Sequence, residues 1–151
     1  MSEQIRAKVT ELMPAIRKDL EQSLTNDLDD ARAERALFVG AKLAETSLRK
    51  AVLDQSLFVE ADLTDADFSE ADMLQCNLTG ARCLRTKFTG AELTYADFSH
   101  ADLTEADLSS AKLFRAVLHR ALEEKAVFSN RAAALGDDAD LAEAEDWPAK
   151  Y

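Results

Sequence analysis

The sequence has little of the turn chemistry that usually reverses a folded chain. Its 151 residues include only four glycines and two prolines, whereas ordinary hairpins and loops depend on both. The two cysteines, Cys76 and Cys83, are too few for a disulfide framework or a four-ligand zinc site. Something other than conventional hairpins must therefore turn this chain.

Membrane and secretion signals are also lacking. No apolar run approaches the length of a transmembrane helix. The N-terminus, MSEQIRAKVTELMP, lacks the apolar core and cleavage site of a signal peptide. We therefore expect a protein of the bacterial cytoplasm that does not bind membranes.

Positive charge is scarce as well. Lysine and arginine total 18 against 29 aspartates and glutamates, which gives a net charge of −11. Nucleic acids and anionic membranes attract basic surfaces, so we expect no direct binding to nucleic acid. The length and a 47% apolar composition are typical of one folded domain.

A five-residue repeat occupies most of the chain. From Ala36 to Asn130 the sequence reads as nineteen consecutive units without an insertion, beginning ALFVG AKLAE TSLRK AVLDQ. The first residue of every unit is small. The third is Leu, Phe or Met in seventeen of the nineteen units, and the exceptions are Cys83 and Glu123.

A period of five fits neither a helix nor an uninterrupted strand. On a helix it would scatter the alanines around the cylinder, and on a strand it would send alternate leucines to opposite faces. It fits a short extended edge followed by a corner, with the first and third residues pointing inward. Four such edges close a coil of twenty residues, and stacked coils bury a continuous apolar column.

These units resemble the pentapeptide-repeat family, whose pattern is A(D/N)LXX. The stretch ADLTDADFSEADMLQCNLTGA shows the pattern most clearly. The resemblance implies a right-handed quadrilateral β-solenoid over residues 36–130, with just under five coils. It says little about function, because members of the family do many different things.

Two flanking segments follow other patterns. Residues 1–35 carry apolar residues at steps of mostly three or four, which predicts an amphipathic helical extension. This extension caps the solenoid of its own chain or docks onto a partner or a second copy. Residues 131–151 form an acidic tail, for which we expect a short helix through 132–135. Trp147, the only tryptophan, either folds back on the solenoid or anchors a partner.

Large apolar residues at outward positions are candidates for an interaction surface. If residues twenty apart stack, Leu37 and Leu57 lie together on one face, and so do Val39 and Val59. The predicted N-terminal helix covers this patch, or a partner or second copy does. A second face carries Leu74, Tyr95 and Phe114, which form an interface or are scattered surface residues.

Acidic residues form ladders along the outward faces. A basic belt of Arg82, Arg85 and Lys87 interrupts them, and neighbouring opposite charges stabilise stacked coils only weakly. Some members of the family resemble DNA in shape and charge and bind DNA gyrase or topoisomerase IV. In that alternative the acidic ladder is the site, and its residues are Asp62, Asp65, Asp67, Asp72, Glu92, Asp97, Asp102, Glu105 and Asp107.

Catalytic groups are sparse. His119 is expected to stack on Ser99, with His100 and Asp97 nearby, which makes a nominal Ser/His/Asp grouping or three metal ligands. Nothing in the sequence supplies an oxyanion hole, a nucleophile elbow or a cleft. We therefore expect no enzyme, no catalytic or metal site and no cofactor, and we expect both cysteines to be core residues.

The sequence thus favours a non-enzymatic module that binds a protein of unknown identity, with a homodimer as one form of that interaction. Two alternatives stay open. One is a DNA-mimicking inhibitor or protector of gyrase or topoisomerase IV. The other is an accessory or effector protein of a bacterial secretion or toxin system.

Overall fold

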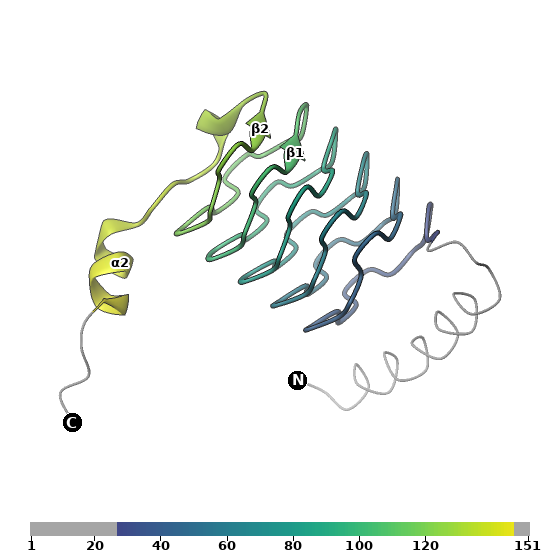
Figure 1. The fold of residues 1–151 in the computed structure, drawn as a ribbon, viewed down its shortest axis with the longest axis horizontal. Helices are drawn as coiled ribbons and strands as arrows, with labels where there is room; N and C mark the ends of the chain where they lie inside the picture. The colour runs from purple at the N-terminus through teal and green to yellow at the C-terminus, as the bar shows by residue number, and fades with distance from the viewer. Residues whose placement is uncertain (1–26, 147–151) are drawn as a thin grey trace.

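The computed structural model describes residues 27–146, which form one solenoid followed by a short tail (Figure 1). The chain turns once in every five residues. Parallel backbone bridges join residues twenty positions apart, such as Leu37 with Leu57 and Leu57 with Asn77. Four sides of five residues therefore make one coil, and residues 27–130 make just over five coils.

The fifth residue of each unit makes the corner in the left-handed backbone region. At twenty consecutive corners, from Asp30 to Lys125, its φ lies between 52° and 68°, although only three of these residues are glycines. This conformation costs a non-glycine residue about 1–2 kcal/mol. Backbone hydrogen bonds offset the cost: Gly40 N–H donates to the Val59 carbonyl at 2.9 Å, and Ala41 N–H donates to the Phe38 carbonyl at 3.0 Å. These bonds explain how the chain turns with so few glycines.

The first and third residues of each unit point inward, as the sequence predicts. In the central coils the alanines and the third residues are fully buried, and so is His119 at an outward position. Phenylalanine rings follow one another through the column, with centroids 4.7 to 5.8 Å apart. These rings belong to Phe38, Phe58, Phe68, Phe88 and Phe98.

Polar residues at the inward first position are satisfied by the preceding coil. The hydroxyl of Ser56 donates to the Ala33 carbonyl at 2.8 Å, and that of Thr86 donates to the Leu63 carbonyl at 2.7 Å. The Cys76 thiol donates in the same way to the Leu53 carbonyl. Burial raises the pKa of the Cys76 thiol to about 12, so this cysteine is a core residue, as expected.

Burial also raises the pKa of the Cys83 thiol. Both cysteines are free and buried.

Aspartates at the second position of many units stabilise the corners. Asp62 Oδ1 accepts from the backbone N–H and the hydroxyl of Thr64, and Asp102 binds Thr104 in the same way. The same backbone bond, from the residue two positions on, is made by Asp67, Asp72, Asn77, Asp97 and Asp107. These aspartates therefore have a structural role that is independent of any partner.

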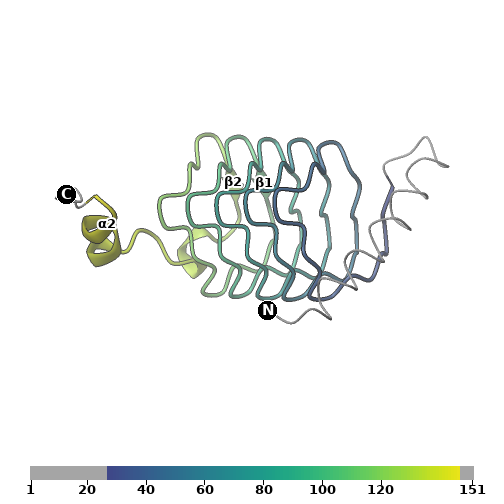
Figure 2. The same cartoon turned by 90° about the horizontal axis from the view of Figure 1, so that it is seen from below.

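Regular strands are short in this fold. β1 (Asp107–Leu108) pairs in parallel with β2 (Val127–Phe128), with Asp107 opposite Val127. The 3-10 helix η1 (Arg131–Ala133) and the helix α2 (Ala139–Glu145) follow. Figure 2 shows α2 lying beyond the C-terminal end of the stack of coils. No helix among residues 27–146 is long and apolar enough to cross a membrane.

The N-terminal boundary of the solenoid differs from the prediction. Residues 27–35, assigned above to the helical extension, already belong to the first coil, where Leu28 packs against the core. Two features of the sequence hide the repeat in this segment. Leu28 follows the upstream apolar residues at a spacing typical of a helix, and Ala33 occupies a third position where a larger residue is usual. The predicted amphipathic helix and Trp147 lie outside the described residues.

The C-terminal end also differs from the prediction. The helix expected through 132–135 is replaced by the shorter η1, and α2 forms further along the tail, where Asp138 accepts from Leu141 N–H at the helix start. Glu123, which breaks the apolar third position, is paired by Arg131 with N···O distances of 2.6 and 2.8 Å. This two-point ion pair neutralises the carboxylate at the end of the column.

The stacked rings generate a first prediction. Phe68 contacts Phe58 and Phe88, with ring centroids 5.8 and 5.5 Å away, so Phe68→Ala opens a cavity that adjoining coils cannot fill. The variant should lose about 3–5 kcal/mol in the free energy of unfolding, measured by urea titration. Val39→Ala, at a residue that is 58% exposed, should change it by less than about 0.5 kcal/mol. Similar losses in both variants would contradict this account of the core.

The corner carboxylates generate a second prediction, because three of them have lowered pKa values. The Thr64 hydroxyl lowers the pKa of Asp62, and the side chain of Ser109 lowers that of Asp107. Burial alone would raise the pKa of Glu92, but hydrogen bonds from Thr94 and Lys112 outweigh it and the net shift is downward. A carboxyl with a lowered folded pKa contributes stability that is complete above its unfolded pKa and is lost as pH falls through its folded pKa.

The free energy of unfolding should therefore decrease as pH falls below about 4. The double variant Asp62→Asn, Asp107→Asn should lose less between pH 7 and pH 3, by about 0.5 kcal/mol for each partly solvated carboxyl. Asparagine keeps the corner bond, as Asn77 does with Thr79 N–H at 2.9 Å. Urea titrations at several pH values measure the slope, and equal slopes for wild type and variant would refute the argument.

Candidate interaction surface

The first apolar patch forms on the first two coils, as the ladder register requires. Leu37 is bridged to Leu57, and the hydrogen bond from Gly40 to the Val59 carbonyl places Val39 beside Val59. Val39 is exposed, whereas the other three are half-buried. The helix expected to cover this patch lies outside the described residues.

The second apolar set meets at one corner of the solenoid. The rings of Tyr95 and Phe114 lie edge to face, with centroids 5.8 Å apart. They remain 48% and 57% exposed. Leu74 is half-buried one coil before Tyr95, where Gln75 N–H donates to the Thr94 carbonyl at 3.0 Å. The structure therefore joins two of the three predicted residues in contact and places the third on the same corner.

The acidic ladders are interrupted by basic residues at close range. Arg85 binds both carboxylate oxygens of Asp65 at 2.7 and 2.6 Å, and this contact lowers the pKa of Asp65. Lys112 pairs with Glu92 at 3.0 Å, and Lys125 lies 3.5 Å from Glu105.

Bridges also align residues of opposite charge along the backbone ladders. Asp62 stands between Lys42 and Arg82, and Asp67 and Asp107 flank Lys87. Arg82 continues the first of these ladders to Asp102. The outward surface thus carries alternating charge along much of its length.

The nominal Ser/His/Asp grouping does not assemble as a catalytic relay. The Ser99 hydroxyl donates to Asp97 at 2.6 Å, so this serine is held by the carboxylate. His119 stands instead beside His100, with ring centroids 5.6 Å apart. Glu145 of α2 contacts both rings, at 3.1 Å from His100 and 3.3 Å from His119.

Sequence reasoning missed Glu145. It lies in the tail, 45 and 26 residues from the two histidines, at no spacing that the repeat fixes. The sequence also does not predict the burial of His119, at 1% exposure, because a residue at an outward position is expected to face solvent.

Comparison with known proteins agrees with the geometry of the coils. A family model for pentapeptide repeats matches in eight copies, over residues 27–64, 56–94 and 81–120. A search of curated proteins returned no match to this sequence.

Solved structures of pentapeptide repeat proteins are also similar to this chain. HetL, involved in heterocyst differentiation regulation in the cyanobacterium Nostoc sp. strain PCC 7120, is 32% identical with a TM-score of 0.39. The match covers 63% of this chain and 44% of HetL, so this chain spans less than half of that protein.

A pentapeptide repeat protein from the cyanobacterium Cyanothece 51142 is 20% identical, with 81% and 92% of the two chains covered and a TM-score of 0.47. QnrB1, a plasmid-mediated fluoroquinolone resistance protein, is 18% identical, with 80% and 66% covered and a TM-score of 0.42. Because the family model matches more than half of the sequence, the chain belongs to the pentapeptide repeat family, whose members form right-handed β-solenoids.

Proposed function

We propose that this protein is a non-enzymatic binding module whose four-sided solenoid presents one corner to a protein partner. The observation that carries the proposal is the exposed pair of Tyr95 and Phe114 in edge-to-face contact. Thr94 occupies the same fourth position as Phe114 one coil earlier, so a polar residue fits this corner equally well. Folding alone therefore does not explain the aromatic side chains.

The corner has properties that favour binding. Exposed aromatic residues contribute a large share of the energy at protein interfaces. Tyr95 and Phe114 belong to adjacent coils joined by the hydrogen bond from Tyr95 N–H to the Phe114 carbonyl at 3.0 Å. Because the ladder already holds the backbone of both residues in place, little conformational entropy is lost at this corner when a partner binds. Gln75 and Arg115 flank the rings and supply the polar rim that interfaces usually have.

The proposal predicts that partner binding depends on this corner. The triple variant Leu74→Thr, Tyr95→Asn, Phe114→Thr should bind at least about tenfold more weakly, because it removes the apolar centre of the interface. Threonine is taken from Thr94 in the same column, and asparagine tolerates the left-handed φ of 58° at position 95. Affinity purification from the source organism, read by mass spectrometry, identifies the partner, and calorimetry with that partner measures the affinity.

Leu84→Thr is the matched control, because Leu84 also occupies a fourth position but on another side of the coil. Circular dichroism and urea titration establish that both proteins fold. If the triple variant and the control bind the identified partner equally, the corner is not the interface.

A second candidate function is modulation of DNA gyrase or topoisomerase IV by a surface that imitates DNA. The net charge of −11 favours it, since a mimic must present dense negative charge. The ion pairs of Arg85 with Asp65 and Lys112 with Glu92 weaken it, because they neutralise part of the ladder. We therefore rank this candidate below the apolar corner.

A supercoiling assay with purified gyrase tests this candidate. A mimic inhibits in a dose-dependent way, and the variant Asp62→Asn, Asp72→Asn, Asp102→Asn should inhibit less, because it removes three charges while keeping the corner bonds. The triple variant of the apolar corner is the control and should inhibit as the wild type does. No effect at micromolar protein would eliminate the candidate.

A further inference from the structure

The two histidines of the chain meet at one place. The sequence has only His100 and His119, and their rings lie nearly perpendicular with centroids 5.6 Å apart. They stand on adjacent coils, joined by the hydrogen bond from His100 N–H to the His119 carbonyl at 2.8 Å. The ladder therefore fixes the spacing of the two backbones.

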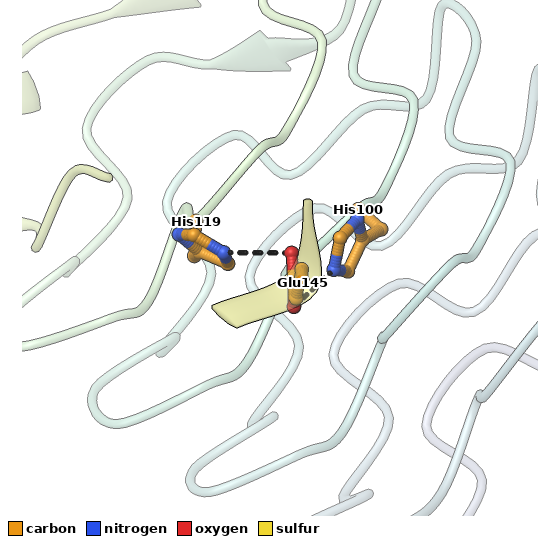
Figure 3. A group of neighbouring side chains, drawn as sticks. All are labelled: His100, His119 and Glu145. Carbon is orange, nitrogen blue, oxygen red and sulfur yellow. Dashed lines mark hydrogen bonds and ion pairs between the residues drawn. The ribbon is translucent and has the colours of Figure 1, made fainter. Parts of the chain in front are cut away.

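The tail brings a carboxylate between the two rings. Glu145, at the end of α2, lies between them in Figure 3. Its Oε1 is 3.1 Å from His100 Nε2, and its Oε2 is 3.3 Å from His119 Nε2. One ligand atom from each of the three residues lies within 4.8 Å of the others.

These distances match those of a metal site. With zinc–ligand bonds of about 2.0–2.1 Å in a tetrahedron, neighbouring ligand atoms are about 3.3 Å apart. The two nitrogen–oxygen contacts, at 3.1 and 3.3 Å, are close to this length but reach different oxygens of Glu145, so binding through one oxygen requires the carboxylate to turn and the imidazole nitrogens to approach. We propose that His100, His119 and Glu145 bind one divalent transition-metal ion of the zinc class and thereby fasten α2 to the solenoid.

The ligand types agree with this metal class. Two neutral imidazoles and one carboxylate suit Zn²⁺, with a fourth position left for water. Asp137 and Asp146 add negative charge around the site. Arg120 pairs with Asp146 at 2.7 Å and with Glu145 Oε2 at 3.1 Å, so zinc must displace the second of these contacts while the first still holds the guanidinium. Arg120 also donates to the Ala142 carbonyl at 2.9 Å, so α2 is held near the histidines before any ion binds.

The proton positions require one rearrangement. His119 Nδ1 accepts from Asp138 N–H at 3.1 Å, so the ring proton is on Nε2, where the metal must bind. Binding releases that proton to solvent and Nδ1 takes one up, so Asp138 N–H can no longer donate to Nδ1 and must turn away from it. The new Nδ1–H then faces Asp137 Oδ1, now 3.8 Å away, as in the carboxylate–histidine–metal pairs that orient many ligands. Asp137 is therefore a positioning residue.

This inference does not rest on the proposed partner surface. The three ligands lie around α2, whereas Leu74, Tyr95 and Phe114 lie on another corner. Partner binding measured in the presence of a chelator tests the apolar corner. Zinc binding measured in the absence of the partner tests the metal site, so either proposal can fail while the other holds.

The test uses the full chain without a histidine tag, stripped with EDTA and titrated with Zn²⁺ in a calorimeter. We expect one ion per chain with a micromolar or tighter Kd, and a higher thermal unfolding midpoint. In a nitrogen-15 NMR spectrum, both imidazoles should shift together as zinc is added. His100→Asn and Glu145→Gln should each bind at least tenfold more weakly.

The variants are chosen so that the fold is preserved. His100 has a left-handed φ of 59°, which asparagine adopts readily. Glu143→Gln, at an exposed residue of the same helix, removes the same charge and should bind zinc as the wild type does. Absence of zinc binding below 100 µM would overturn the proposal. Equal affinity of Glu145→Gln and Glu143→Gln would also overturn it, because the ion would then bind the two imidazoles without the carboxylate of the tail.

Discussion

The backbone ladder between residues twenty positions apart is the constraint on which the rest of the structure depends. It joins coil to coil along the described solenoid. Each bonded pair fixes the direction of the side chains above and below it, so the core, the corners and the outward faces follow from one register. The ladder also stabilises the left-handed φ of the many non-glycine corner residues, because each corner is hydrogen-bonded to the next coil.

Much of this architecture could be predicted from the sequence, because the repeat determines it. A small first residue and a large third residue identify the two inward positions of each unit. Counting units also places Tyr95 and Phe114 on adjacent coils at the same corner. Departures from the pattern are harder to predict. Residues 27–35 were missed because alanine replaces the large third residue at position 33. The position of Glu145 could not be predicted, since no repeat connects the tail to the coils.

Charge and apolar contact have separate roles in this molecule. The aspartates of the repeat serve the corners, as Asp62 and Asp102 do with their threonines. Several other acids are paired with the basic residue of an adjacent coil. Hence the strongly negative composition is in part a consequence of the repeat and does not by itself indicate a partner. The aromatic pair and the cluster of His100, His119 and Glu145 are required neither by the core nor by the corners.

The five-residue side has a consequence for how such a chain tolerates insertions and deletions. Losing or gaining one unit leaves the core intact, but it turns every later face by a quarter of a revolution relative to the earlier ones. A change of four units restores the alignment. Tyr95 contacts Phe114, and His100 contacts His119, from adjacent coils. Losing or gaining one unit between the members of a pair would therefore separate them, although the coils would still stack. Chain length in such a solenoid therefore sets the angular position of its surface groups, independently of its stability.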